Sequence, residues 1–383
     1  MPLRVLFIFG TRPEAIKMCP VIRHMKSRPR DFAVRVCVTG QHREMLDQVL
    51  RAFGVTPDRD LSVMRPGQTL CQSTSRIVAG LEPVLADLKP DVALVQGDTT
   101  TTLCGALAAF YAGIPVAHIE AGLRTGDPSQ PFPEEMNRLL TGRLAAFHFA
   151  ATESAARNLY REGVNPDTVF VTGNTGIDAV LHVKRALEAG ELQGLNGFRK
   201  ISSKRLIVVT AHRRESFGAG FERICSAIAR LARRDDIEII YPVHPNPHVR
   251  QKVAHYLAAR PNVTLQEPMD YVPFVDLMRR AYLLLTDSGG IQEEAPSLGK
   301  PVLVLREKTE RPEAVSAGTA VIVGTDERRI VSAVERLLDD SGAYRQMARR
   351  HNPYGDGRAS AMIADAMLEL KGAPQPAAPG VSR

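Results

Sequence analysis

The chain has 383 residues, enough for two domains with separate cores, and its 44% hydrophobic and 24% charged residues are ordinary for a globular protein. A net charge of +7 fits an anionic small molecule better than a nucleic acid, because Trp and basic segments interleaved with aromatic residues are both missing. No apolar run reaches the roughly 18–20 residues that span a membrane, and five scattered cysteines without a C-x-x-C pair favour a reduced, cytoplasmic compartment over disulfides or a structural metal.

The first half of the chain alternates short apolar segments with amphipathic ones. The expected strands are Val5–Phe9, Val34–Thr39, Val92–Gln96, Pro115–Ile119, His148–Ala151 and Val169–Val171. The expected helices are Ala15–Lys26, Glu44–Phe53, Leu70–Leu88, Leu103–Tyr111, Glu134–Phe147 and Ser154–Glu162. Continuously apolar strands are buried on both faces, which indicates a parallel sheet covered by helices.

A helix is expected at Asp178–Glu188, followed by a Gly- and Lys-containing surface connection over 190–203. After it, the alternation of apolar and amphipathic segments begins again. The second set of expected strands is Leu206–Thr210, Ile237–Tyr241, Val263–Leu265, Leu283–Thr286, Val302–Leu305 and Val321–Val323. We therefore predict an α/β protein of two Rossmann-like, doubly wound domains, residues 1–172 and 173–358. The Ala- and Pro-rich segment 372–383 is predicted to be a disordered tail.

Ligands of such sheets bind beyond the carboxyl ends of the strands, so the residues that follow each strand carry the functional signal. The first strand leads into Gly10-Thr11-Arg12-Pro13, which is not the G-x-G-x-x-G dinucleotide fingerprint. Arg12 and Lys17 would surround a helix N-terminus, a natural anion site. From spacing alone, an ordinary capped helix with two surface cations remains the alternative.

Three acidic residues follow three further elements. Asp98 comes after Val92–Gln96, Glu120 lies at the tip of the next buried strand, and Glu134 opens a helix. Asp98 alone could be a helix N-cap, and Glu134 alone could complement a helix dipole. A carboxylate buried at a strand tip is harder to explain structurally, so the three together favour acid–base chemistry.

The second half offers groups suited to a diphosphate. His212 follows a strand beside two arginines, and Arg311 precedes a helix start. Ser288-Gly289-Gly290 opens another helix, where free N–H groups and close backbone approach would cradle phosphate. Glu294, one turn into that helix, could accept hydrogen bonds from a ribose diol.

Long ordered motifs carry a family resemblance. GTRPEAIKM, QGDTTTT, HIEAGLRTGD, PEEMNRLLTG, TAHRRESFG, TDSGGIQEEAPSLGKPVLVLRE and NPYGDGRAS together resemble the bacterial non-hydrolysing UDP-N-acetylglucosamine 2-epimerases, from about residue 10 to about 370. The resemblance implies a glycosyltransferase-B-like fold with the active site in the interdomain cleft. It also implies that the last helix, about 359–371, returns to the first domain, and that the protein is a homodimer.

The resemblance also assigns roles to individual residues. The catalytic positions are matched by Asp98, Glu120, Glu134 and His212. The diphosphate positions are matched by Arg12, Lys17, Ser288, Gly289, Gly290 and Arg311, the ribose position by Glu294 and the uracil pocket by Phe274. A regulatory site for a second UDP-N-acetylglucosamine is matched by Gln41 and His244, whereas Glu44 differs from the residue that some relatives carry there.

The implied reaction needs neither a metal nor a redox cofactor. The C2 proton of the sugar is not acidic enough for direct removal, so we expect anti elimination of UDP to 2-acetamidoglucal, followed by re-addition. The expected partners are UDP-N-acetylglucosamine and UDP, and the product would supply cell-surface polysaccharide synthesis. A hydrolysing epimerase, an epimerase of a related diacetamido sugar, a glycosyltransferase and a UDP-sugar sensor without turnover remain alternatives.

Overall fold

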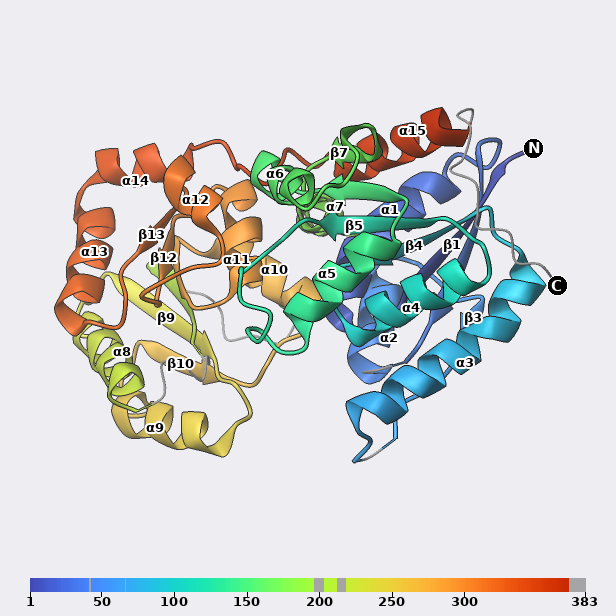
Figure 1. The fold of residues 1–383 in the computed structure, drawn as a ribbon. Coiled ribbons are helices and arrows are strands. Elements are labelled where there is room, and N and C mark those ends of the chain that lie inside the picture. The colour runs from blue at the N-terminus through green and yellow to red at the C-terminus, as the bar shows by residue number, and fades with distance from the viewer. Residues whose placement is uncertain (41–42, 66, 196–202, 212–217, 372–383) are drawn as a thin grey trace. The chain divides into compact units, whose positions relative to one another are not determined.

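The computed structural model describes residues 1–40, 43–65, 67–195, 203–211 and 218–371 (Figure 1). The chain divides into two compact units. Unit 1 contains residues 1–179 and the described residues from 355 onward, and unit 2 contains residues 180–354. The division falls within helix α7 (Thr175–Glu188).

Unit 1 is built on a parallel sheet with the order β3-β2-β1-β4-β5-β6-β7. Its strands are β1 (Leu3–Phe9), β2 (Phe32–Val38), β3 (Arg59–Asp60), β4 (Val92–Gln96), β5 (Val116–Ala121), β6 (Phe147–Ala150) and β7 (Val169–Val171). Its helices are α1 (Arg12–Lys26), α2 (Arg43–Ala52), α3 (Leu70–Leu88), α4 (Thr100–Tyr111), α5 (Glu134–Leu144) and α6 (Glu153–Arg161), with a 3₁₀ turn at Pro166–Thr168. Val5 of β1 is paired with Val34 on one side and Val92 on the other.

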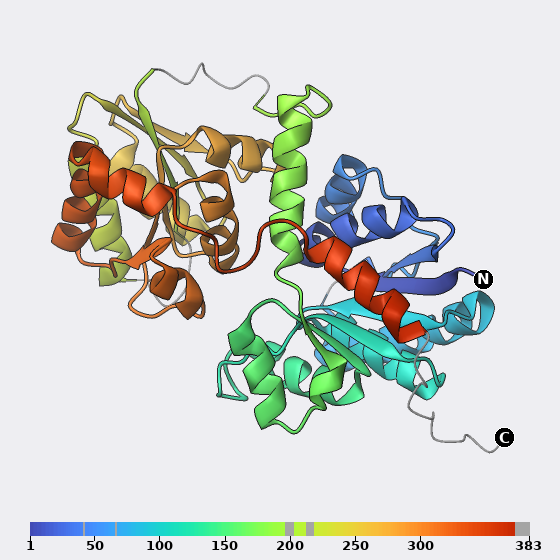
Figure 2. The same ribbon diagram turned by 90° about the horizontal axis from the view of Figure 1, so that it is seen from above.

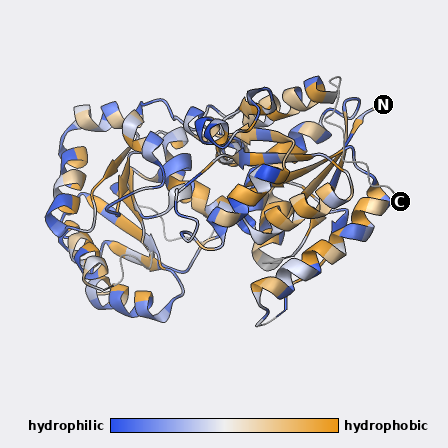
Figure 3. Cartoon of the chain, viewed as in Figure 1, coloured by the Kyte–Doolittle hydropathy of each residue, from blue (hydrophilic) through white to orange (hydrophobic). Residues whose placement is uncertain are grey.

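Local sequence explains the start of these helices. Thr11 accepts a hydrogen bond from the backbone N of Glu14, whose side chain returns to the N-cap backbone, and Thr69 and Gln72 form the same capping box before α3. Thr99 and Thr152 cap α4 and α6. The strands of both sheets are strongly apolar, whereas the helices alternate apolar and polar residues (Figure 3), as expected for central strands covered on both faces.

Unit 2 repeats this architecture with the parallel order β10-β9-β8-β11-β12-β13. Its strands are β8 (Arg205–Thr210), β9 (Ile237–Pro242), β10 (Val263–Gln266), β11 (Leu283–Thr286), β12 (Val302–Val304) and β13 (Ala320–Ile322). Its helices are α8 (Ala219–Leu231), α9 (Pro247–Leu257), α10 (Tyr271–Arg280), α11 (Gly289–Glu294), α12 (Pro312–Ala317), α13 (Glu327–Asp339) and α14 (Ser341–Ala348), with a 3₁₀ turn at Ala295–Leu298.

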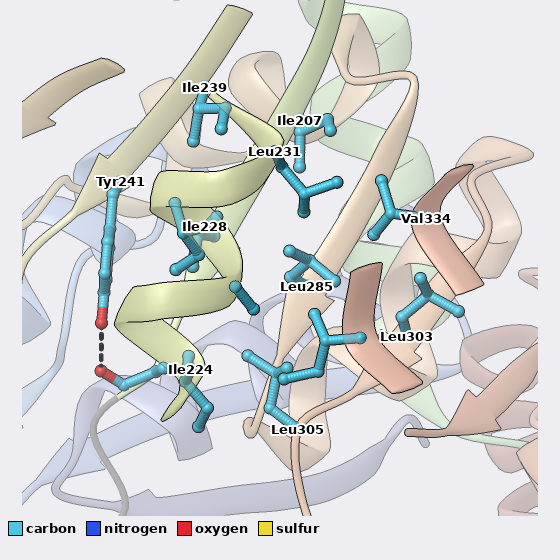
Figure 4. Packing of buried hydrophobic residues seen from close by; sticks show 14 of the residues in the cluster. Ile207, Ile224, Ile228, Leu231, Ile239, Tyr241, Leu285, Leu303, Leu305 and Val334 are labelled. Carbon is cyan, nitrogen blue, oxygen red and sulfur yellow. Dashed lines mark hydrogen bonds between the residues drawn. The ribbon is translucent and has the colours of Figure 1, made fainter. Parts of the chain in front are cut away.

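One face of the second sheet packs against α8 and α13. Ile228 and Leu231 of α8 lie among Ile207, Leu285 and Val334 in a fully buried cluster (Figure 4). At its edge the buried Tyr241 hydroxyl donates to the Ala211 carbonyl at 2.7 Å. Since Ala211 directly follows β8, this bond connects the carboxyl ends of β8 and β9.

The last described helix, α15 (Ala359–Lys371), lies against α1 in unit 1 (Figure 2). Arg28 forms an ion pair with Asp365 at 2.6 Å. Asp178 of α7 is buried and accepts hydrogen bonds from the backbone N of Ala359 at 3.3 Å and of Ser360 at 2.8 Å. The first turn of α15 is therefore capped by a side chain about 180 residues earlier in the chain.

The predicted α/β class with two Rossmann-like domains is confirmed, and the differences are local. The helix predicted to reach Phe147 ends at Leu144, because Phe147–Ala150 instead joins the sheet beside β5. The two-residue strand β3 has no apolar signal and was not predicted. Among the described helices, none combines the length and apolar character needed to cross a membrane.

Candidate active site

The strand order reverses direction between β1 and β4 in unit 1 and between β8 and β11 in unit 2. Loops diverge at such switch points, and ligands of open α/β sheets bind there. The switch-point loops contain Gly10–Arg12 and Gly97–Thr99 in unit 1, and Asp287–Gly289 in unit 2. The predicted His212 follows β8 and lies outside the described residues.

Asp98 is held by helix α5. Arg138 donates from Nε and Nη2 to Asp98 Oδ2 at 3.0 and 2.7 Å, and Asn137 Nδ2 donates to the Asp98 carbonyl at 2.8 Å. Burial works to lower the pKa of Arg138, but Asp98 and Glu135 more than offset it, so this pKa is raised. The N-cap of α4 is Thr99, so the alternative reading of Asp98 as that N-cap is wrong.

Glu120 has a strained backbone. Its φ is +65°, a region that non-glycine residues rarely occupy, and the pairing of β5 with β6 shifts register between Ile119 and Ala121. The side chain forms an ion pair with Lys17 of α1 and accepts from Gln96 Nε2 at 2.5 Å. Strain of this kind is concentrated at functional sites, where surrounding contacts compensate for it.

Glu134 is the first residue of α5, as predicted. Its Oε2 atom is buried and has no hydrogen-bond partner among the described residues. Such orphaned buried atoms are uncommon in folded proteins and call for an explanation. A hydrogen bond from a substrate would supply one.

The turn after β1 depends on Gly10. A Cβ atom there would lie 1.9 Å from Thr39 Oγ1, so only glycine fits. The buried Glu14 accepts hydrogen bonds from the backbone N of Gly10 and Thr11 at 3.1 and 2.8 Å. Arg12 is half-buried at the first position of α1, where a cation and free N–H groups together suit an anion.

His118 supports the turn that contains Asp98. Burial, the largest cause, lowers the pKa of this histidine to about 3, so its ring is neutral at physiological pH. Its Nε2 lies 2.7 Å from the Gly97 carbonyl oxygen and acts as the donor in the neutral ring. Gly97 has φ +75° with open space around its Cα, consistent with a turn that a ligand approaches.

In unit 2, Arg311 lies over the first turn of α11. A Cβ atom on Gly289 would be 3.5 Å from Arg311 Nη2, and one on Gly290 would meet nothing within 4 Å. Ser288 is the N-cap residue but makes no capping bond with its side chain. Arg311 Nε donates to the buried Glu293, which fixes the guanidinium plane. Free backbone N–H groups and a fixed guanidinium suit a diphosphate.

Glu294 ends α11 and faces α10. Tyr271 donates its hydroxyl to Glu294 Oε2 at 3.4 Å, and burial, followed by the charge of Glu294, raises the pKa of Tyr271 well above its usual value. Phe274, one turn along α10, is half-buried. The predicted ribose and uracil residues therefore come from helices that contact each other.

The predicted regulatory residues are less well described. His244 follows β9, is exposed, and accepts a hydrogen bond at Nδ1 from the Asn246 backbone N at 3.2 Å. Gln41 and the side chain of Glu44 lie outside the described part of the chain.

The described contacts group the predicted residues by unit. In unit 1, Lys17 and Glu120 meet directly, and Gln96 links Glu120 to the strand that precedes Asp98. In unit 2, Arg311, Ser288, Gly289 and Gly290 surround the start of α11. Sequence reasoning missed Arg138, Glu293 and Gln96. The spacing of Arg138 three residues after Glu135, its ion-pair partner on the same helix, was the available signal for that residue.

The chain is similar to known proteins over nearly its whole length. The family model described as UDP-N-acetylglucosamine 2-epimerase matches residues 23–368. A UDP-N-acetylglucosamine 2-epimerase from Salmonella typhimurium is 56% identical over 379 residues, covering 96% of this chain and 99% of the relative.

Solved structures agree as well. The UDP-GlcNAc 2-epimerase from Neisseria meningitidis bound to UDP-GlcNAc is 48% identical, with a TM-score of 0.88, and the match covers 96% of this chain and 100% of that one. A glycotransferase of kitacinnamycin, 14% identical with a TM-score of 0.60, shares the fold alone and supports the glycosyltransferase-B-like class. The extent and identity of these matches show that the chain belongs to the UDP-N-acetylglucosamine 2-epimerase family.

Proposed function

We propose that the chain is a non-hydrolysing epimerase that interconverts UDP-N-acetylglucosamine and UDP-N-acetylmannosamine at C2. The observation that carries this proposal is the arrangement of three acids in unit 1. Asp98 is paired with the buried Arg138 and Glu120 with the half-buried Lys17, whereas Glu134 has a buried oxygen without a partner among the described residues. Epimerisation needs a group that removes a proton and a group that returns one, and the three acids of unit 1 offer candidates for both roles.

The reaction proceeds by elimination. A carboxylate takes the C2 proton, the C–H electron pair forms the C1=C2 double bond, and the C1–O pair leaves with UDP. A second acid then protonates C2 of the 2-acetamidoglucal from the opposite face, and the UDP oxygen attacks C1 again. Neither a metal nor a redox cofactor takes part in this scheme.

The UDP leaving group needs its own partners. Arg311 and the backbone at Ser288, Gly289 and Gly290 would bind the diphosphate, together with Arg12 and Lys17, as the family resemblance implies. Glu294 would hold the ribose, and Phe274 would line the uracil pocket. Fixed cations at the leaving oxygen stabilise the charge that develops as C1–O breaks.

The product formed from UDP-N-acetylglucosamine in D2O tests the proposal. NMR should show UDP-N-acetylmannosamine that carries deuterium at C2, because the abstracted proton exchanges with solvent before C2 is protonated again. Free N-acetylmannosamine with UDP would instead identify a hydrolysing enzyme. Product that retains the original hydrogen at C2 would contradict the elimination.

We also propose regulation by a second molecule of UDP-N-acetylglucosamine, at a site that includes Gln41, Glu44 and His244. The exposed position of His244 after β9 supports access to a ligand. Pure UDP-N-acetylmannosamine should then be consumed slowly until a trace of UDP-N-acetylglucosamine is added. Full-rate consumption from the first second would rule this regulation out.

Finally, we propose that the enzyme works in the cytoplasm and supplies a cell-surface polysaccharide, as the resemblance implies. Deletion of the gene should remove a polymer that contains N-acetylmannosamine or its oxidised derivative. An unchanged surface polymer composition would contradict this role.

A further inference from the structure

Arg138 lies buried between two acidic side chains at the carboxyl edge of the sheet in unit 1. On one side its Nε and Nη2 donate to Asp98 Oδ2 at 3.0 and 2.7 Å, and on the other its Nη1 donates to Glu135 Oε2 at 2.8 Å. The exposed fraction is 7% for the Arg138 side chain and 2% for Glu135, but 27% for Asp98. The buried guanidinium thus joins an inaccessible carboxylate to one that solvent or substrate can reach.

Glu135 is itself fixed by the backbone. Its Oε1 accepts hydrogen bonds from the N atoms of Thr125 and Gly126 at 3.0 and 3.3 Å, in the loop after β5. Because both oxygens of Glu135 are engaged, Arg138 has little freedom to rotate. Asn137, the neighbour of Arg138 on α5, also holds the Asp98 backbone. Helix α5 therefore restrains both the main chain and the side chain of Asp98.

The restraint on the carboxylate is one-sided. Both bonds from Arg138 end on Oδ2, and no described residue donates a hydrogen bond to Oδ1. Two N–H groups of the planar guanidinium hold Oδ2 in place, and because Asn137 also holds the main chain of Asp98, the carboxylate has little freedom to turn. Oδ1 is then presented in a constant direction, as a group that transfers a proton within hydrogen-bond reach requires.

We propose that Arg138 and Glu135 are positioning residues that act through Asp98, which enters the reaction as a carboxylate and exchanges the C2 proton at Oδ1. This inference rests on the proposed epimerase function. When the proton moves from C2 to Oδ1, the C–H electron pair becomes the C1=C2 bond and UDP leaves with the C1–O pair. Arg138 keeps its own protons throughout and bonds only to Oδ2.

Arg138→Lys tests the positioning role because it keeps the charge but loses the planar fork. The kcat should fall by roughly 10- to 100-fold, part of the factor that a well-placed acid–base group contributes, while KM and the affinity for UDP stay within about 3-fold. Arg124→Lys is the matched control. The Arg124 side chain is also largely covered, with 9% exposed, and donates to both oxygens of Glu162 at 2.7 and 2.8 Å.

Arg124→Lys should lower the melting temperature as much as Arg138→Lys does, but leave kcat near that of the wild type. A wild-type kcat in Arg138→Lys would overturn the proposal. So would equal losses of kcat in the two variants, because the effect of Arg138 would then be purely structural. Glu135→Gln gives a second measurement: it keeps Arg138 but weakens its anchor, and its kcat should fall with KM unchanged.

Double variants show whether Arg138 acts through Asp98. Deuterium uptake at C2 over long incubations at high enzyme concentration measures weak activity. In the Asp98→Asn background, Arg138→Lys should lower the rate of deuterium uptake by less than a further factor of about 3, because the effects of residues that act as a unit are not additive. In the Glu134→Gln background, Arg138→Lys should lower this rate by the same factor as in the wild type. Equal effects in both backgrounds would overturn the inference. A wild-type enzyme that forms no UDP-N-acetylmannosamine would instead contradict the proposed function itself.

Discussion

At the scale of single residues, the candidate site departs from ordinary protein structure in two ways. Glu120 occupies a backbone conformation that costs on the order of 1–3 kcal/mol in a non-glycine residue. Glu14, by contrast, is a buried acid in the first turn of α1. Its four acceptor contacts are all with neutral donors: two backbone N–H groups and the hydroxyls of Thr99 and Thr102. The first departure lies at a candidate acid of the site, and the second holds the turn after β1 in shape.

Glu14 gives a prediction about pH and stability. Burial, the largest cause, raises the pKa of Glu14 above its ordinary value of 4.5, although the surrounding hydrogen bonds oppose this. The stability contributed by the protonated group is therefore fully present below about pH 4.5 and is lost as pH rises through the folded-state pKa. Glu14→Gln has no such proton to lose, so the wild type should become less stable relative to this variant as pH increases.

Urea unfolding of both proteins from pH 4.5 to 8 measures this difference. A difference in unfolding free energy that stays constant over the whole range would mean that the pKa of Glu14 is not raised in the folded protein.

At the scale of elements, the site in unit 1 is assembled by the ends of β1, β4 and β5 together with the first turns of α1 and α5. The strand ends carry Gly10, Asp98 and Glu120, while the helices carry Lys17 and Arg138, which hold the two acids. A similar long-range cap fixes α15, whose first two amides are bound by Asp178 of α7. In each case one element completes the hydrogen bonding of another that is distant in sequence.

Asp178→Ala should loosen α15 without unfolding the unit. Loss of a side chain that caps a helix costs about 1–2 kcal/mol, which corresponds to a roughly 5- to 30-fold change in an equilibrium. Hydrogen exchange at the amides of α15 should accelerate by that factor. Asp340→Ala is the control, because Asp340 caps α14 through the N atoms of Gly342 and Ala343 and should change exchange in α14 alone. Unaltered exchange in α15 of Asp178→Ala would show that this cap is dispensable.

At the scale of the whole molecule, two units of the same architecture provide different chemistry. Acids and their paired cations lie in unit 1, and unit 2 provides the guanidinium and glycine turn suited to a diphosphate. Unit 1 also exposes large apolar side chains on three neighbouring helices. They are Leu70 of α3, Phe110 and Tyr111 of α4, and Met136 and Leu140 of α5. Exposed apolar surface of this kind marks interaction sites, and we propose that it forms the interface of a homodimer.

Light scattering coupled to gel filtration checks this proposal. The wild type should elute with twice the 41.9 kDa mass of the chain, and Tyr111→Arg should dissociate it into monomers, because a buried unpaired charge is costly. Tyr160→Arg is the matched control. Tyr160 is also an exposed tyrosine in the last turn of a helix, α6, and its replacement should leave the dimer intact. A monomeric wild type, or a Tyr111→Arg protein that remains dimeric, would contradict the interface.

The sequence by itself determined the α/β class, the two parallel sheets and most strand positions, because continuously apolar segments such as Val92–Gln96 are buried wherever they lie. It also located the candidate acids, since function in this fold follows the strand ends. The sequence did not predict where α5 ends. The apolar run through Phe147 is compatible with a helix or a strand, and only its pairing with β5 shows that Phe147 belongs to a strand.

What only the tertiary structure decided is how the site residues are held. Arg138 meets Asp98 across 40 residues and Lys17 meets Glu120 across 103, and no local pattern encodes which cation reaches which carboxylate. Nor does spacing predict that Glu120 adopts a positive φ or that an oxygen of Glu134 is buried without a partner. Periodicity depends on neighbours along the chain, whereas the orientation and pairing of a buried charge depend on neighbours in space.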